Sequence, residues 1–370
     1  MPTDRSERFA FLDALRGLAA LAVLVSHILK RTSPQLRWFV DRQFELGHAG
    51  VIVFFLISGW VIPLSLERGN LREFWVRRVC RLYPLYWVMV GATLAVLLVP
   101  HLLDPWWDSL TEVNDARLAL ARAPGAFVTH NVLMTQSVAG WPHVNILAWT
   151  LTVEMVFYLT ASFALACGAL ERPGPIVIGL LGLAVLVRNA WWLMVPEYLH
   201  DLLLDLAIMW SGSVLYGLHA GHVSLRSAQV AFGATSLVVV GLCLSAVTGS
   251  NPVIASVSLA RLSAFGVFLV GLSLRACSFP AVVLWLGRIS YSIYLMHSLV
   301  LMTIRPLGHP LASAAVWLGA TLLVASLTYR FIETPGIHLG RWLSRFRGVV
   351  PAHDGHRDPS GVGVSTPAPR

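Results

Sequence analysis

The feature that most constrains this chain is a run of apolar stretches, each about 20 residues long and separated by short polar segments. A stretch of that length can cross the hydrocarbon core of a bilayer as an α-helix. The pattern predicts an all-α fold, a polytopic integral membrane protein with about ten transmembrane helices. The expected spans lie near residues 10–29, 48–66, 83–103, 147–168, 175–195, 202–219, 228–248, 253–273, 279–303 and 311–331.

Composition agrees, because 56% of the 370 residues are hydrophobic and 12% are charged, whereas about a quarter of a soluble domain is charged. A net charge of +8 could indicate a nucleic-acid partner. The excess, however, is mostly arginine in short segments between spans, where positive charge marks the cytoplasmic side. We therefore expect membrane lipid, and no nucleic acid, as a partner.

The distribution of arginine predicts a multi-pass protein of the cell membrane with both termini in the cytoplasm. This orientation places Arg68, Arg226 and Arg275 inside and the long segment 104–146 outside. One segment disagrees, since it would carry Lys30, Arg31, Arg37 and Arg42 outside. Asp13 and Arg16 within the first apolar stretch favour a retained span over a cleaved signal peptide. We expect no disulfide among the four cysteines.

We divide the chain into a transmembrane domain at residues 1–335 and a cytoplasmic tail at residues 336–370. The tail is basic, and its end is rich in proline, glycine, serine and histidine without apolar periodicity. Such a composition predicts that most of the tail is disordered.

Ionisable side chains inside a span are costly and usually face a protein interior or a water-filled cavity. The first span carries Asp13, Arg16 and His27. Arg16 and His27 share a helical face and lie about 16.5 Å apart along the axis, while Asp13 lies one turn before Arg16. All three are candidate catalytic residues, although Asp13 and Arg16 are also compatible with a structural ion pair, and His27 with a buried structural histidine. As a candidate catalytic residue, His27 has the side chain best suited to proton transfer near neutral pH.

Glu154 and His297 are expected at a depth similar to that of His27, which suggests one catalytic site. Asp205, Arg188 and Arg261 are expected to form packing pairs or line a cavity. No residue set suggests a metal site.

Arg77, Arg78 and Arg81 form a basic cluster between the second and third spans. If this segment is helical, two of the guanidinium groups lie on one face and can bind phosphate oxygens in a bidentate manner. The alternative is that these arginines only mark the cytoplasmic side and attract anionic lipid.

Several stretches together resemble the acyltransferase-3 family of membrane-bound O-acyltransferases. They occur in the family's usual order and cover residues 9–335, at 11–27, 50–59, 77–84, 149–158, 286–297 and 331–335. Trp60 and Thr150 depart slightly from the family pattern, where other residues are usual.

The resemblance implies an enzyme that transfers an acyl group, most often acetyl, from acyl-CoA to a hydroxyl of a carbohydrate or glycosylated acceptor. Acyl-CoA would be a co-substrate, with no tightly bound cofactor. Arg16 and His27 correspond to one family motif and Arg78 and Arg81 to another. Ser58 and Tyr291 match further recurrent positions, which we assign to donor binding. We expect a stand-alone transferase, and leave acceptor identity, acyl chain length and oligomeric state open.

Two other classes of protein share parts of this pattern. A secondary transporter also has about ten spans with buried charges, although we find no duplicated halves in the sequence. A membrane scaffold would not need histidine, glutamate and arginine at defined depths. For the enzyme, His27 is expected to act as a general base or to carry the acyl group itself.

Overall fold

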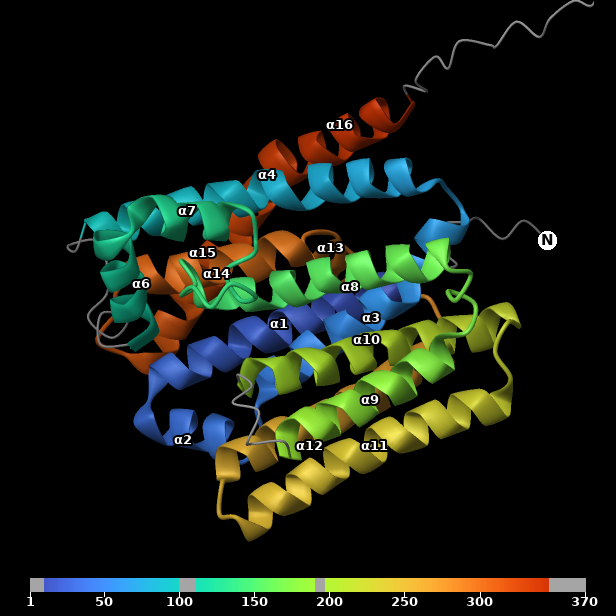
Figure 1. Ribbon diagram of the computed structural model, residues 1–370. Helices are drawn as coiled ribbons and strands as arrows, with labels where there is room; N and C mark the ends of the chain where they lie inside the picture. The colour runs from blue at the N-terminus through green and yellow to red at the C-terminus, as the bar shows by residue number, and fades with distance from the viewer. Residues whose placement is uncertain (1–9, 100–110, 190–196, 346–370) are drawn as a thin grey trace, which may run out of the picture.

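The computed structural model describes residues 10–99, 111–189 and 197–345, and the regular elements in these ranges are all helical (Figure 1). The all-α prediction is therefore confirmed. The helices are α1 (Ala10–Thr32), α2 (Pro34–Arg42), α3 (Leu46–Glu67), α4 (Leu71–Leu98), α6 (Thr111–Arg122), α7 (Pro124–Val132), η3 (Ile146–Ala148), α8 (Trp149–Ala166), α9 (Pro173–Asn189), α10 (Glu197–Ala220), α11 (Leu225–Thr248), α12 (Pro252–Ser273), α13 (Ala281–Arg288), α14 (Ser290–Thr303), α15 (Pro310–Thr328), η5 (Tyr329–Glu333) and α16 (Thr334–Arg345).

Eight helices in the described ranges are long and apolar enough to cross a membrane, by length and composition. Two of the expected spans differ from the others. The stretch at 175–195 corresponds to α9, which has 17 residues, and the stretch at 279–303 is divided between α13 and α14. Figure 1 shows both running alongside the longer helices of the bundle.

The bundle has two distinct ends (Figure 1). At the arginine end, as we call it, α1 and α4 begin and α3, α8, α10 and α12 end. At the α2 end, α3, α8, α10 and α12 begin, and the short helices α2, α6 and α7 cover part of the surface.

Helices α3 and α10 pack in backbone contact at the centre of the bundle. A Cβ atom at Gly59 would lie 1.8 Å from the carbonyl oxygen of Met209, and one at Gly212 would lie 2.4 Å from that of Leu56. Small residues permit this close approach where no apolar driving force favours helix association. The glycine after Ser58 therefore has a packing role.

The basic cluster around Arg78 is helical from its start, because α4 begins at Leu71 rather than near residue 83. The Asn70 side chain caps the helix by accepting from the Glu73 backbone N–H at 2.8 Å. The apolar pattern did not predict this first part of α4 because the arginines interrupt it. The side chains of Arg78 and Arg81 line a cavity inside the protein, so α4 can carry these charges within an apolar bundle.

The basic segment that disagreed with the expected orientation contains acidic partners for its charges. Lys30 Nζ lies 2.9 Å from Asp41 Oδ1 and 2.5 Å from Glu45 Oε2. Arg37 Nε lies 3.6 Å from Asp41 Oδ2. The net positive charge at this end is therefore smaller than the count of basic residues indicates.

The expected tail begins as an ordered helix, since residues 336–345 belong to α16 and pack along α4. A Cβ atom at Gly336 would lie 2.4 Å from the Cys80 carbonyl oxygen. Residues 346–370 lie outside the described residues.

Candidate active site

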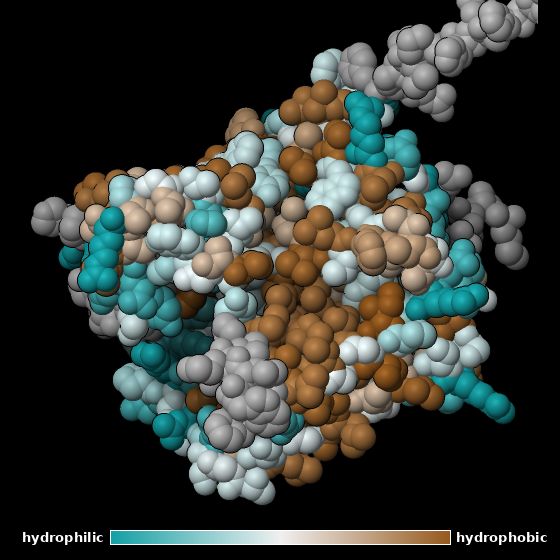
Figure 2. Space-filling view, in the orientation of Figure 1, coloured by the Kyte–Doolittle hydropathy of each residue, from teal (hydrophilic) through white to brown (hydrophobic). Residues whose placement is uncertain are grey.

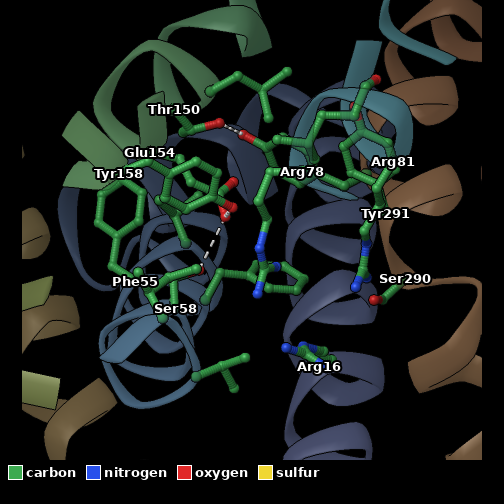
Figure 3. A pocket seen from close by; sticks show the side chains of 17 residues that line it. Arg16, Phe55, Ser58, Arg78, Arg81, Thr150, Glu154, Tyr158, Ser290 and Tyr291 are labelled. Carbon is green, nitrogen blue, oxygen red and sulfur yellow. Dashed lines mark hydrogen bonds between the residues drawn. The ribbon is translucent and has the colours of Figure 1, made fainter. Parts of the chain in front are cut away.

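A cavity between α1, α3, α4, α8 and α14 contains most of the side chains that the sequence singled out (Figure 3). We call it the arginine pocket, and its volume is ≈ 90 Å³. Its lining consists of Arg16, Val51, Phe54, Phe55, Ser58, Val61, Ile62, Arg78, Arg81, Leu82, Thr150, Leu151, Glu154, Tyr158, Ser290, Tyr291 and Tyr294.

Three guanidinium groups meet in this pocket. Figure 3 shows Arg78 and Arg81 extending from α4 in the same direction, toward Arg16 of α1. The predicted pair of Asp13 and Arg16 is present, with 3.4 Å between Asp13 Oδ1 and Arg16 Nη1. The Arg78 guanidinium lies 5.6 Å from the centroid of the Tyr158 ring, within cation–π range.

Glu154 brings the single carboxylate in the lining of the arginine pocket. Its Oε1 accepts hydrogen bonds from the Ser58 hydroxyl at 3.1 Å and the Tyr158 hydroxyl at 2.5 Å. Ser58 therefore holds Glu154. Three arginines and one carboxylate leave the lining cationic, and because like charges away from water repel strongly, the pocket favours an anionic ligand.

Two tyrosines of α14 define the other side of the pocket. The Tyr291 hydroxyl donates to the Leu82 carbonyl oxygen at 2.7 Å and joins α14 to α4. The Tyr294 and Thr150 hydroxyls are hydrogen-bonded at 2.8 Å and join α14 to α8. Tyr294 also contacts His297, with 6.0 Å between ring centroids.

Behind Tyr294, His27 of α1 faces His297 of α14, with 5.2 Å between ring centroids. His297 is fully buried. Its Nδ1 donates to the Ile293 carbonyl oxygen at 3.1 Å, so the neutral ring keeps Nε2 as an acceptor. In the part of the chain that the structure describes, Nε2 has no hydrogen-bond partner. The pair thus contains a buried nitrogen able to accept a proton.

The predicted site residues therefore fall into two groups and two outliers. The arginine pocket contains Arg16, Arg78, Arg81, Ser58, Glu154 and Tyr291. His27 and His297 form the adjacent histidine pair, as their predicted depth suggested. Glu154 bonds to Ser58 and Tyr158 instead of to either histidine. Asp13 reaches the site only through Arg16, and Arg77 is half exposed outside the pocket, paired with Glu73 and Ser344.

A second, larger cavity of ≈ 1090 Å³ opens at the α2 end, and we call it the α2-end cavity. Figure 2 shows a hollow lined by hydrophilic side chains at this end. Its polar and aromatic lining includes His48, Ser137, Trp141, His143, Trp149, Arg188, Asn189, Tyr198, His200, Asp201, Asp205 and Arg261. Asp205 and Arg261 thus line a cavity, one of the two alternatives that the sequence left open. His48 was missed, because a lone histidine beside an apolar stretch has no distinctive pattern.

Three charged side chains of the α2-end cavity, Arg261, Asp201 and Asp205, lie close together. Arg261 Nη2 lies 3.5 Å from Asp201 Oδ1 and 3.6 Å from Asp205 Oδ1. The His48 ring is stacked with Trp149, with 6.5 Å between centroids. His143, between Gln136 and Ser137, is largely buried, and this burial lowers its pKa to about 4.

These features define a helical membrane protein with a buried cationic pocket beside a histidine pair. Comparison with known proteins identifies its family: the chain belongs to the acyltransferase-3 family, described as an acyltransferase domain, which matches residues 9–330. Membership confirms the resemblance seen in the sequence. No solved structure matches the chain.

Individual relatives vary in how much of their length the chain covers. The peptidoglycan O-acetyltransferase OatA of Listeria monocytogenes is 24% identical across 91% of this chain and 57% of its own length. The acyltransferase MdmB of Streptomyces mycarofaciens is 32% identical across 42% of this chain and 39% of its own length. The exopolysaccharide production protein ExoZ of Rhizobium meliloti is 29% identical across 80% of this chain and 92% of its own length.

Proposed function

We propose that this protein is a membrane-bound O-acyltransferase that moves an acyl group, acetyl in the simplest case, from cytoplasmic acyl-CoA to a hydroxyl of a sugar-containing acceptor. The observation that carries the proposal is the convergence of Arg16, Arg78 and Arg81 in one pocket next to two histidines. An anionic donor offsets the charge of the arginines, and a histidine serves the transfer of a proton.

The dimensions of acyl-CoA suit this arrangement. Arg16 and His27 lie on one face of α1, eleven residues or about 16.5 Å apart along the axis. Thirteen bonds separate the nearer phosphorus of the CoA diphosphate from its sulfur, and at about 1.2 Å per bond an extended arm reaches about 16 Å. A diphosphate held by the arginines therefore brings the thioester to the histidine pair.

The acceptor class is proposed from relatives whose names refer to peptidoglycan and exopolysaccharide. Both are carbohydrate polymers with many hydroxyl groups, which an O-acyltransferase can modify. The arginine end is assigned to the cytoplasm, where acyl-CoA is available, and the α2 end to the opposite side.

In the proposed reaction, the acceptor hydroxyl oxygen attacks the thioester carbonyl carbon while a histidine takes the hydroxyl proton. The carbon–sulfur bond breaks, and the CoA thiolate leaves and takes up a proton. His27 is assigned as the base, and His297, directly beside it, stabilises the protonated ring by accepting a hydrogen bond at Nε2. Glu154 lines the arginine pocket, where it accepts hydrogen bonds from Ser58 and Tyr158, and is not assigned to orienting His27.

A test of the reaction uses membranes from cells that contain or lack the protein, supplied with radiolabelled acetyl-CoA. The expected results are release of free CoA and label in the glycan fraction that depend on the protein. Uptake of label without cleavage of the thioester would contradict the proposal and favour a transporter.

Orientation is tested separately with a membrane-impermeant thiol reagent on intact cells. Native Cys277, exposed at the arginine end, should not react, whereas a cysteine replacing Asn114 of α6 should react. The reverse pattern would move the arginine pocket to the outer side and remove cytoplasmic acyl-CoA as the donor.

A further inference from the structure

The α2-end cavity has no role in the donor chemistry described so far, although it is the larger of the two cavities. It lies where α3, α8, α10 and α12 begin and α9 ends. The arginine pocket instead takes its three arginines from the first halves of α1 and α4, toward the arginine end. The two cavities are therefore displaced toward opposite ends of the bundle.

Helices α3 and α8 form a wall that the two cavities share. On α8, Trp149 and Thr152 face the α2-end cavity, whereas Thr150 and Glu154 face the arginine pocket. Phe55, on the pocket side, contacts Trp149 edge to face with 6.2 Å between ring centroids. At Phe55 and Trp149, the wall between the cavities consists of this one pair of aromatic side chains.

The α2-end cavity is also close to the histidine pair through the first turn of α3. A Cβ atom at Gly47 would lie 3.1 Å from the side chain of Ser26, the residue next to His27. His48, which follows Gly47, lines the cavity. The start of α3, which carries a residue of the cavity lining, therefore packs against the part of α1 that carries the proposed base.

The polar groups of the cavity suit a neutral ligand with many hydroxyls. Two arginines and two aspartates line it, so the formal charge is balanced, in contrast to the arginine pocket. The Asp201 side chain keeps 60% of its surface exposed, although it is paired with Arg261. Arg261 is 5% exposed and its Nε has no hydrogen-bond partner among the described residues. A buried donor without a partner favours a ligand that supplies one.

Aromatic rings complete the match to a carbohydrate. Trp141, Trp149 and Tyr198 line the same cavity as the charged groups. Such side chains offer flat apolar faces for the C–H surface of a pyranose ring, and their polar edges can bond its hydroxyls. A cavity of ≈ 1090 Å³ is large enough for several sugar units.

We propose that the α2-end cavity binds the carbohydrate acceptor, with Asp201 and Arg261 bonding sugar hydroxyls and Trp149 packing against a sugar ring. This inference rests on the proposed function. It assigns donor and acceptor to cavities on opposite sides of the α3–α8 wall, with the histidine pair at the edge where they meet. Binding of the acceptor requires no covalent step.

The test measures acetyl transfer by the full-length protein in lipid nanodiscs, with radiolabelled acetyl-CoA and linear oligosaccharides of glucose or N-acetylglucosamine. The Asp201→Asn and Trp149→Leu variants should each raise the KM for the saccharide on the order of ten- to a hundred-fold. The KM for acetyl-CoA should stay within about two-fold, because neither side chain lines the arginine pocket. Glu171→Gln, at an exposed carboxylate between α8 and α9, is the matched control and should change neither constant.

A second measurement separates this inference from the proposed function. Saccharide should raise the unfolding temperature of the wild type in the absence of donor, and less so in Asp201→Asn. If acetyl-CoA is never consumed but this stabilisation is seen, the catalytic proposal fails while the acceptor cavity stands. Unchanged saccharide constants in both variants, or no stabilisation by any saccharide, would overturn the assignment of the cavity.

Discussion

The arginine pocket and the α2-end cavity use the same residue types in opposite ways. Three arginines and one carboxylate line the pocket, which leaves a net positive charge even with Asp13 paired to Arg16. The cavity places Arg261 between Asp201 and Asp205. Uncompensated charge away from water favours an ionic ligand, whereas paired charge leaves hydrogen-bonding groups for a neutral one. Charge balance therefore distinguishes the two cavities more clearly than the number of charged residues does, in line with the donor and acceptor proposed for them.

The largest effect on acyl transfer is expected at His27, the proposed base. Replacing His27 with Ala should lower acyl transfer by about 10²–10⁴-fold, the usual contribution of a positioned base. The donor KM should change little, because His27 does not line the arginine pocket. Kinetics in nanodiscs give both values.

The same preparation distinguishes two forms of the reaction. With donor alone and rapid quench, an acyl-histidine intermediate would leave one acyl group on the wild type, and direct transfer would leave none. A folded His27→Ala protein that transfers acetyl at the native rate would remove the histidine from the mechanism.

The next largest effect concerns the anionic donor. The double variant Arg78→Gln, Arg81→Gln should weaken acetyl-CoA binding, because each charge-assisted hydrogen bond contributes about 1.5–3 kcal/mol. Lysine should restore binding only in part, since it cannot form the bidentate contact. Equilibrium binding of CoA provides the measurement.

Arg77→Gln is the matched control, because Arg77 lies on the same helix but is half exposed and paired with Glu73. It should leave CoA affinity unchanged. Equal losses in Arg77→Gln and the double variant would mean that total charge, instead of the pocket, attracts the donor.

A smaller and opposite effect is expected at Glu154. Glutamine keeps an oxygen that accepts from Ser58 and Tyr158 but removes the negative charge. CoA affinity should therefore rise by a factor of about five, which corresponds to about 1 kcal/mol. A loss of turnover with unchanged affinity would instead give Glu154 a role in the chemical step.

The smallest effect concerns pH at the α2-end cavity. Burial lowers the pKa of His143 to about 4, so the folded state favours the neutral ring. Its stabilising contribution is present above about pH 6.5, the unfolded value, and is lost as the pH falls toward 4. His143→Gln should therefore reduce the loss of thermal stability between pH 6.5 and 4. An identical loss in the variant would show that other groups cause it.

Much of the arginine pocket was predictable because its residues follow regular spacings. The three-residue interval from Arg78 to Arg81 and the shared face of Arg16 and His27 depend only on helix geometry. Predicted depth did not show that Glu154 hydrogen-bonds to Ser58 and Tyr158 instead of to the histidines. Contacts between helices decide which residues meet, and one sequence does not contain them.

The α2-end cavity could not be predicted as a site because its residues come from seven parts of the chain. Several charged or aromatic residues of its lining begin or interrupt apolar stretches singly, without a shared interval, namely His48, Trp149, Asp201 and Arg261. These residues meet because the first turns of several helices pack together, and that packing cannot be read from the spacing of residues along the chain. Two of the expected spans also differ in detail from the prediction, because the stretch 279–303 is divided between α13 and α14 at residue 289 and α9 is short.

The backbone contact between α3 and α10 at Gly59 and Gly212 limits how this molecule can move. Helix α3 carries Ser58 in the arginine pocket and His48 in the α2-end cavity. With no side chain between the two backbones, sliding α3 along α10 would drive carbonyl groups together. The α3 side of the wall between the two cavities is thus held in place by its backbone contact with α10. Any opening of the two cavities is therefore expected to come from other helices of the bundle.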